Sequence, residues 1–358
     1  MKKNKRPKTT LLWFLILATG LTWCISCSGD TPSLILTPSN TPISYELPRP
    51  WGFGQMPIPL ENPMTVEGVN LGEQLFFDPI LSADSSMSCG SCHFPKRGFT
   101  DNLPVSRGIH NKEGVRSSMS LINVGYMDTG LFWDGRVQLL EDQALLPVSD
   151  SSELAHQWSQ VEWDLRKNPT YQQAFSNAFG IRDTSDLTRD LVVKALAQYE
   201  RSLISSGNSR YDRFRAGTLE LTEDEAIGYD LFFDISPAVK DAECGNCHNA
   251  PLFTTNEFVN NGVQTAKTLS DFKDPGQGAI SGNRYDNGKF RIPTLRNITL
   301  TAPYMHDGRF ETLEEVIDHY NEGGQPSPNV HSLVRPLGLT KKEKTQLLAF
   351  LHTLTDEN

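Results

Sequence analysis

The pentapeptide Cys-x-x-Cys-His occurs twice in this 358-residue chain, once from Cys89 to His93 and again from Cys244 to His248. Two thiols three positions apart reach both vinyl groups of one porphyrin, and the His that follows turns onto the iron as proximal ligand. The pattern therefore predicts two covalently bound c-type haems. The residues that would hold them are Cys89, Cys92, His93, Cys244, Cys247 and His248.

Two other kinds of site use paired cysteines. Structural zinc binds four thiols from two Cys-x-x-Cys pairs, and a redox dithiol needs one pair. Zinc ribbons usually space their pairs closely, whereas Cys92 and Cys244 lie far apart and a His follows each pair. Haem is therefore favoured over both alternatives.

The N-terminal residues follow the arrangement of an export signal peptide, a basic segment before an apolar one. Five positive charges precede an apolar stretch, residues 11–23, which is shorter than the roughly 18 residues that a spanning helix needs. Residues 1–26 are predicted to be a lipoprotein-like signal peptide with Cys27 as the lipidated residue, although Cys24 stands where a lipobox usually has Leu. A plain secretory signal and an uncleaved anchor remain alternatives. We expect a periplasmic or cell-envelope protein tethered to the membrane through the Cys27 lipid.

Charge narrows the range of partners. The chain has 33 Lys and Arg against 43 Asp and Glu, and without the five cations of the signal the balance is 28 to 43, a net charge of −15. Such a negative surface repels nucleic acid, which argues against it as a partner, and attracts basic proteins.

Residues 27–50 are rich in Pro, Ser and Thr and predict a tether rather than a folded segment. Beyond it, Leu-Phe-Phe-Asp occurs at residues 75–78 and again at 231–234, each time about a dozen residues before a haem motif. A Phe-Thr pair also follows each motif, at 99–100 and 253–254. The chain is therefore predicted to repeat one haem-binding unit.

Helical patterns flank both motifs, and no sustained alternation of polar and apolar residues predicts an extensive sheet. Capping boxes start helices at Thr222 and Thr340, and an amphipathic helix is expected over residues 186–204. We predict a mainly α protein with little β, in which two cytochrome c-like haem domains follow one another. The N-terminal haem domain would span residues 51–207, and the C-terminal haem domain residues 208–358.

Three further segments resemble the bacterial dihaem cytochrome c peroxidases, a family that includes the MauG-like enzymes. The resemblance runs from about residue 68 to 352, in the family's order. It rests on Phe132-Trp133-Asp134-Gly135-Arg136 with Gln143, Pro147 and Glu153, on residues 201–214, and on residues 291–308.

The resemblance assigns catalytic roles at the first haem. It places Gln143 and Glu153 over this haem and Trp133 between the two haems, where an indole can relay electrons. Cleaving the O–O bond of a peroxide requires a proton to move from the near oxygen to the leaving one, which a carboxylate can do while an amide holds the geometry.

The resemblance also implies iron ligands opposite the two proximal His residues. His110 lies near the position of a distal His that blocks the first iron in the oxidised peroxidases. Where those peroxidases have a Met ligand to the second iron, this chain has Tyr320, the pattern of the MauG-like branch. The alternatives for the second iron are Met305 and His319, with Tyr320 as a core residue.

A calcium ion lies between the haem domains of this family. Thr301 and Pro303 match positions that offer carbonyl oxygens, but Ser117 replaces the usual Asn. A hydroxyl is a weaker calcium ligand than an amide carbonyl, so we leave calcium open.

The resemblance thus implies an exported peroxidase that reduces hydrogen peroxide to water with electrons from a small cytochrome c or cupredoxin. The first alternative is a MauG-like enzyme that oxidises side chains of a partner protein. The second, of another class, is a non-catalytic dihaem electron carrier, against which Gln143 and Glu153 argue. The oligomeric state is left open, a homodimer included.

Overall fold

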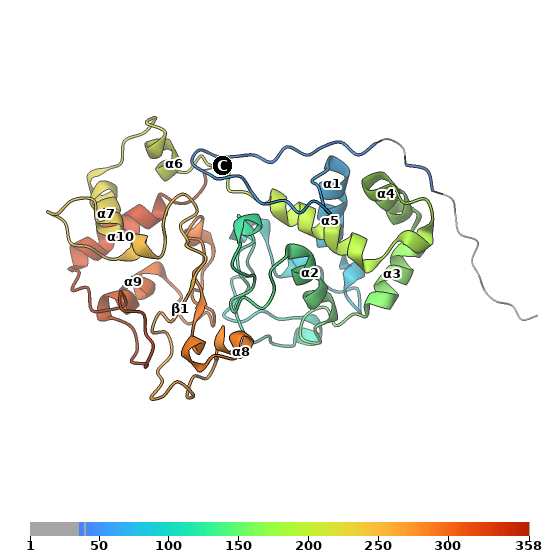
Figure 1. Ribbon diagram of the computed structural model, residues 1–358. Helices are drawn as coiled ribbons and strands as arrows, with labels where there is room; N and C mark the ends of the chain where they lie inside the picture. The colour runs from blue at the N-terminus through green and yellow to red at the C-terminus, as the bar shows by residue number, and fades with distance from the viewer. Residues whose placement is uncertain (1–35, 39–40, 358) are drawn as a thin grey trace, which may run out of the picture. The chain divides into compact units, whose positions relative to one another are not determined.

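The computed structural model describes residues 36–38 and 41–357, and within these ranges the protein is mainly helical (Figure 1). The predicted signal peptide, Cys27 and the other tether residues up to 35, with residues 39–40, lie outside the described residues. In chain order the helices are α1 (Val66–Phe77), α2 (Leu140–Ser149), α3 (Trp158–Lys167), α4 (Pro169–Phe179), α5 (Arg189–Ser202), α6 (Arg210–Arg215), α7 (Glu223–Phe233), α8 (Gly278–Ser281), α9 (Leu313–Glu322) and α10 (Lys341–His352). Among the helices described, none has the length and apolar character needed to cross a membrane.

The sheet content of the described residues is small, as predicted. Strand β1 (Phe258–Val259) pairs antiparallel with β2 (Phe290–Arg291), with Phe258 opposite Arg291. These two strands matter because β2 carries Arg291, which lines two separate cavities.

Helices α7 and α10 each begin with the reciprocal capping box that their sequences predict. The Thr222 hydroxyl accepts from the Glu225 amide while the Glu225 carboxylate accepts from the Thr222 amide, and Thr340 forms the same pair with Glu343. Thr312 begins α9 in this way too. These local signals fix where α7, α9 and α10 begin.

Two pairs of packed helices repeat the same arrangement. Helix α1 packs against α5, and α7 packs against α10. At each contact a glycine permits close approach: a Cβ at Gly72 would collide with the carbonyl of Ala195, and one at Gly228 with that of Gln346. The sequence repeat therefore corresponds to a repeated helix pair in three dimensions.

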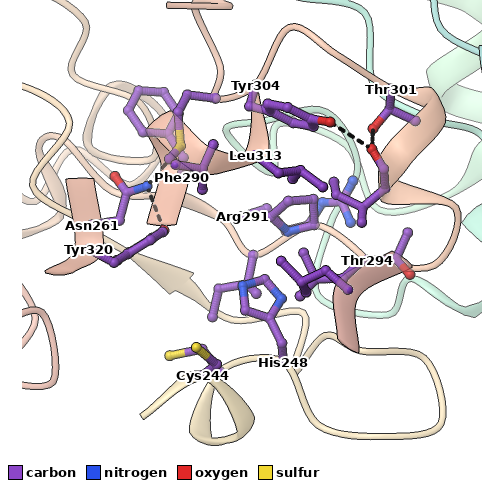
Figure 2. Close-up of a pocket in the computed structure, with 18 of the residues that line it drawn as sticks. Cys244, His248, Asn261, Phe290, Arg291, Thr294, Thr301, Tyr304, Leu313 and Tyr320 are labelled. Carbon is purple, nitrogen blue, oxygen red and sulfur yellow. Dashed lines mark hydrogen bonds between the residues drawn. The ribbon is translucent and has the colours of Figure 1, made fainter. Parts of the chain in front are cut away.

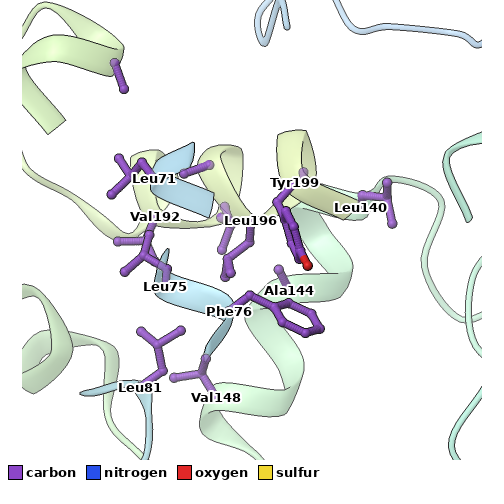
Figure 3. Close-up of a cluster of buried hydrophobic side chains, with 14 of the residues drawn as sticks. Leu71, Leu75, Phe76, Leu81, Leu140, Ala144, Val148, Val192, Leu196 and Tyr199 are labelled. Atoms are coloured by element: carbon purple, nitrogen blue, oxygen red, sulfur yellow. The ribbon is translucent and has the colours of Figure 1, made fainter. Parts of the chain in front are cut away.

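The helix pairs belong to two hydrophobic clusters. The first, drawn in Figure 3, gathers buried side chains of α1, α2 and α5, among them Leu75, Phe76 and Leu196. The second centres on α7 and α10 with Phe232 and Phe350. Described members of the first end at residue 203 and those of the second begin at residue 211, so the predicted boundary at 207/208 falls between them, although one compact unit includes both.

Candidate active site at two haem-binding cavities

Each Cys-x-x-Cys-His segment forms one tight helical turn at the wall of a cavity. The turns are η2 (Cys89–Ser91) and η7 (Cys244–Asn246), and the amides of His93 and His248 donate to the carbonyls of Cys89 and Cys244 at 3.0 and 2.9 Å. The turn brings both thiols and the His to one side, where they line a cavity of about 230 Å³ in each case.

The repeated Leu-Phe-Phe-Asp segments support these turns. A Cβ at Gly90 would collide with the ring of Phe77, and one at Gly245 with the ring of Phe233. The second Phe of each segment is thus packed on the backbone of its haem motif. This contact explains why both copies have Gly after the first Cys.

A backbone carbonyl orients the imidazole of each predicted proximal ligand. Nδ1 of His93 lies 2.8 Å from the carbonyl oxygen of Phe99, and Nδ1 of His248 lies 3.0 Å from that of Phe253. Phe99 and Phe253 both have positive φ, 58° and 55°. Since a carbonyl can only accept, Nδ1 carries the proton and Nε2 keeps the lone pair that iron requires.

The two cysteine pairs line separate cavities, so they cannot share one zinc ion. Within the described part of the chain, no group of three or more His, Cys, Asp or Glu could hold a metal. Burial raises the pKa of Cys92 and of Cys244 to about 12, which disfavours the thiolates that zinc binding and dithiol exchange need. The donor set fits haem better than either alternative.

Gln143 and Glu153 both line the cavity that contains His93. Gln143 lies on α2, and Glu153 follows the end of that helix. Pro147, one turn after Gln143, has no N–H to donate to the carbonyl of Gln143, and its own carbonyl accepts from the amide of Leu154 at 3.1 Å. The proline thus helps the chain turn out of α2, so that Glu153 faces the same cavity.

The environment of Glu153 favours its protonated form. Burial, with a smaller contribution from the negative charge of Asp150, raises the pKa of this carboxyl from 4.5 to about 7, while Arg136 opposes the shift. A carboxyl with a pKa near neutrality can take up and release a proton at physiological pH.

Trp133 lines both cavities. Its indole Nε1 donates to the carbonyl of Ser117 at 3.0 Å, and its own carbonyl accepts from the amide of Arg291 at 2.9 Å. An indole ring fixed through Nε1, on a backbone that is itself hydrogen-bonded, is suited to pass electrons between groups in the two cavities.

Ion pairs secure the turn that carries Trp133. The buried carboxylate of Asp134 accepts from Arg116 at 2.5 Å and from Arg136 at 3.1 Å, and Arg116 also bonds Asp274 at 2.8 Å. The side chains of Arg116 and Asp134 are 14 and 7% exposed. A charge network this well buried positions the turn more firmly than surface pairs would.

Tyr320 lines the cavity of His248 (Figure 2). The side-chain amide of Asn261 donates to its hydroxyl at 3.2 Å and to the sulfur of Met305 at 3.3 Å. Burial raises the pKa of Tyr320 to about 12, and the Asn261 hydrogen bond acts in the opposite direction. Met305 also lines this cavity. His319 does not line it, and Nε2 of His319 forms a hydrogen bond with the backbone carbonyl of Asn261.

His110 lies apart from the other predicted site residues. Its side chain is 76% exposed, Nδ1 is 3.8 Å from the carboxylate of Asp84, and it is not among the residues that line the His93 cavity. Ligation of the first iron by His110 would therefore require this loop to move.

Ser117, Thr301 and Pro303 all line the cavity of His248. The Ser117 hydroxyl donates to the carbonyl of Met305 at 2.9 Å, and the backbone carbonyl of Ser117 accepts from the indole of Trp133. Calcium takes six to eight oxygens, so these three residues would need water or further groups to complete a site.

Three site residues escaped the sequence analysis. Asn261 contacts two alternative iron ligands, Arg291 lies between the cavities, and Glu200 lines the His93 cavity with one buried carboxylate oxygen that has no hydrogen-bond partner. Arg291 stands between two apolar residues, Phe290 and Ile292, a pattern that could have marked it as a buried charge.

Comparison with known proteins identifies the family. A family model described as di-haem cytochrome c peroxidase matches residues 66–220. A cytochrome-c peroxidase, IdrP1, of Denitromonas iodatirespirans is 35% identical over 84% of each chain. The chain belongs to the dihaem cytochrome c peroxidase family.

Other members of this family are similar over still more of the chain. The methylamine utilization protein MauG of Methylorubrum extorquens is 32% identical over 97% of this chain and 94% of its own. The crystal structure of a MauG-like protein associated with microbial copper homeostasis matches with a TM-score of 0.79 and 33% identity, over 88% of this chain and 96% of that chain. Family membership confirms the predicted class of enzyme, an oxidoreductase of the peroxidase type, with haem as its cofactor.

Proposed function

We propose that this protein reduces hydrogen peroxide to water with electrons from a small cytochrome c or cupredoxin. The observation that carries the proposal is the carboxyl of Glu153, which has a pKa near neutrality and lies with Gln143 in the His93 cavity. A carrier of electrons alone has no need of such a group. Two covalent haems, held by the six Cys and His residues, would supply the iron that binds peroxide and the electrons that reduce it.

The protein's own residues would divide the work between the two cavities. Glu153 takes a proton from the near oxygen of peroxide and returns it to the leaving oxygen, while the amide of Gln143 orients the substrate. His93 and His248 present neutral Nε2 atoms, and Trp133 carries electrons between the cavities. In this scheme the two halves are cytochrome c-like haem domains in tandem, the first peroxidatic and the second for electron transfer.

A MauG-like oxidation of side chains on a partner protein is the second candidate. Tyr320 favours it, because it lies in the His248 cavity where a phenolate could ligate iron and stabilise its higher oxidation states.

One measurement tests the cofactor, and a second separates the proposed functions. Mass spectrometry of the denatured protein should show two added haems, and one or none would contradict the cofactor assignment. A peroxide turnover assay with reduced cytochrome c should show catalysis. Reaction with peroxide without turnover of the donor would favour the MauG-like function, and no reaction at all would leave an electron carrier.

We further propose a periplasmic or cell-envelope location with a lipid on Cys27. The support is the N-terminal sequence alone, a basic segment followed by an apolar one and Cys27. Cys27→Ala should release the protein from the membrane fraction, whereas the control Cys24→Ala should not. Release of neither variant, or of both, would contradict lipidation at Cys27.

Calcium at Ser117, Thr301 and Pro303 and a homodimeric state stay predictions. Elemental analysis after dialysis tests the first, and light scattering of the eluted holoprotein tests the second.

A further inference from the structure

Arg291 is a buried cation, and no carboxylate of residues 41–357 pairs with it. It is 5% exposed, and burial alone lowers the pKa of its guanidinium to about 10. Other buried arginines of the described chain have carboxylate partners. These pairs are Arg296 with Asp212, Arg201 with Glu141, and Arg116 with Asp134 and Asp274.

The terminal nitrogens of Arg291 meet only weak acceptors. Nε donates to the carbonyl of Phe132 at 3.3 Å, but one terminal nitrogen lies 2.8 Å from the sulfur of Met127 and the other 3.5 Å from that of Met119. Thioether sulfur accepts hydrogen bonds poorly. A buried guanidinium needs an anion or several strong acceptors to offset its lost hydration, so these contacts leave most of the cost uncompensated.

Arg291 also lies where an anion would arrive with the cofactor. It lines the cavity of His93 and the cavity of His248, and Figure 2 shows it beside the latter. A haem has two propionate groups, and a guanidinium fork matches a carboxylate through two parallel hydrogen bonds.

We propose that Arg291 binds a haem propionate at the boundary of the two cavities and thereby raises the reduction potential of that haem. The inference rests on the proposed binding of two haems. Reduction adds negative charge to a haem, so a fixed cation beside its propionate favours the reduced state. Without the cation, the propionate becomes easier to protonate, and reduction then takes up a proton.

The test is a redox titration of the holoprotein at several pH values. Arg291→Gln and Arg291→Met remove the charge, and Met also preserves apolar packing. We expect either variant to lower the reduction equilibrium constant of at least one haem by about tenfold, or about 59 mV for one electron. The loss should shrink at low pH, where the freed propionate is protonated. Arg291→Lys keeps the charge and should stay near wild type.

Arg189→Gln is the matched control, because it removes an equal charge from an exposed position at the start of α5 and should leave the potentials unchanged. Haem content is measured first by mass: a wild-type protein without two haems overturns the proposed function itself. With both haems bound, unchanged potentials and pH dependences in Arg291→Gln and Arg291→Met overturn the propionate assignment alone. A loss in Arg291→Lys equal to that in Arg291→Gln also overturns it, because charge would then not be the cause.

Discussion

The pH dependence of peroxide turnover should report the carboxyl of Glu153. Its pKa is raised from 4.5 to about 7, chiefly by burial. The carboxylate must accept a proton, so the ionised form is active and turnover falls as the pH drops through 7. Between pH 7 and pH 5 the ionised fraction falls from about one half to about 1%, a roughly 50-fold loss, whereas an unshifted carboxyl would lose less than about 1.5-fold.

Variants of Glu153 and its neighbours sharpen this test. Glu153→Gln keeps the shape but cannot carry a proton, so turnover at high pH should fall by about 10², or about 2.7 kcal/mol in the barrier, and the acid limb should vanish. Asp150→Asn removes a charge that raises the pKa of Glu153 and should move the limb to lower pH. Arg136→Gln removes an opposing charge and should move it to higher pH.

Stopped-flow mixing of the reduced holoprotein with peroxide from pH 5 to 9 measures these effects without titration of the electron donor. The exposed Glu220, replaced by Gln, is the matched control and should behave as wild type. If Glu153→Gln keeps both the rate and the acid limb, then another group titrates and the mechanism proposed for Glu153 is wrong.

Five other substitutions test three features of the structure. His110 lies at the surface, so His110→Gly should leave the reaction of the oxidised protein with peroxide unchanged in stopped-flow traces; a marked acceleration would show that His110 blocks the iron before reduction. Tyr320→Met should raise the reduction potential of the second haem in redox titrations. Asn261→Leu should lower that potential, because it removes a hydrogen bond from the phenolate oxygen of Tyr320. If neither variant changes the potential, Tyr320 is a core residue and not an iron ligand. Gly228→Ala presses a methyl group onto a backbone carbonyl and should cost about 1–3 kcal/mol in thermal denaturation, whereas Gly54→Ala, with open space around it, should be neutral. Equal melting temperatures for the two alanine variants would contradict the close packing of α7 and α10.

The sequence by itself determined the features that depend on near neighbours. The Cys-x-x-Cys-His spacing predicts the two haem-binding turns because one helical turn suffices to bring the thiols and the His together. The capping boxes predicted where α7 and α10 begin, because Thr222 and Glu225 satisfy each other's amides within four residues. The resemblance to the peroxidases added Gln143, Glu153 and Trp133, whose roles no local pattern reveals.

Only the tertiary structure decided the features that depend on burial and on contacts across the chain. Glu153 has a pKa near neutrality because of what surrounds it, and Asn261 reaches Tyr320 across 59 residues of sequence. His110, in contrast, lies exposed and is not among the residues that line the cavity to which the resemblance assigns it. Arg291 is the strongest case: its side chain meets Met127 and Met119, more than 160 residues earlier in the chain. The lack of a carboxylate beside it can be seen only when the folded chain has placed every charge, because the cost of a buried cation depends on all the atoms around it.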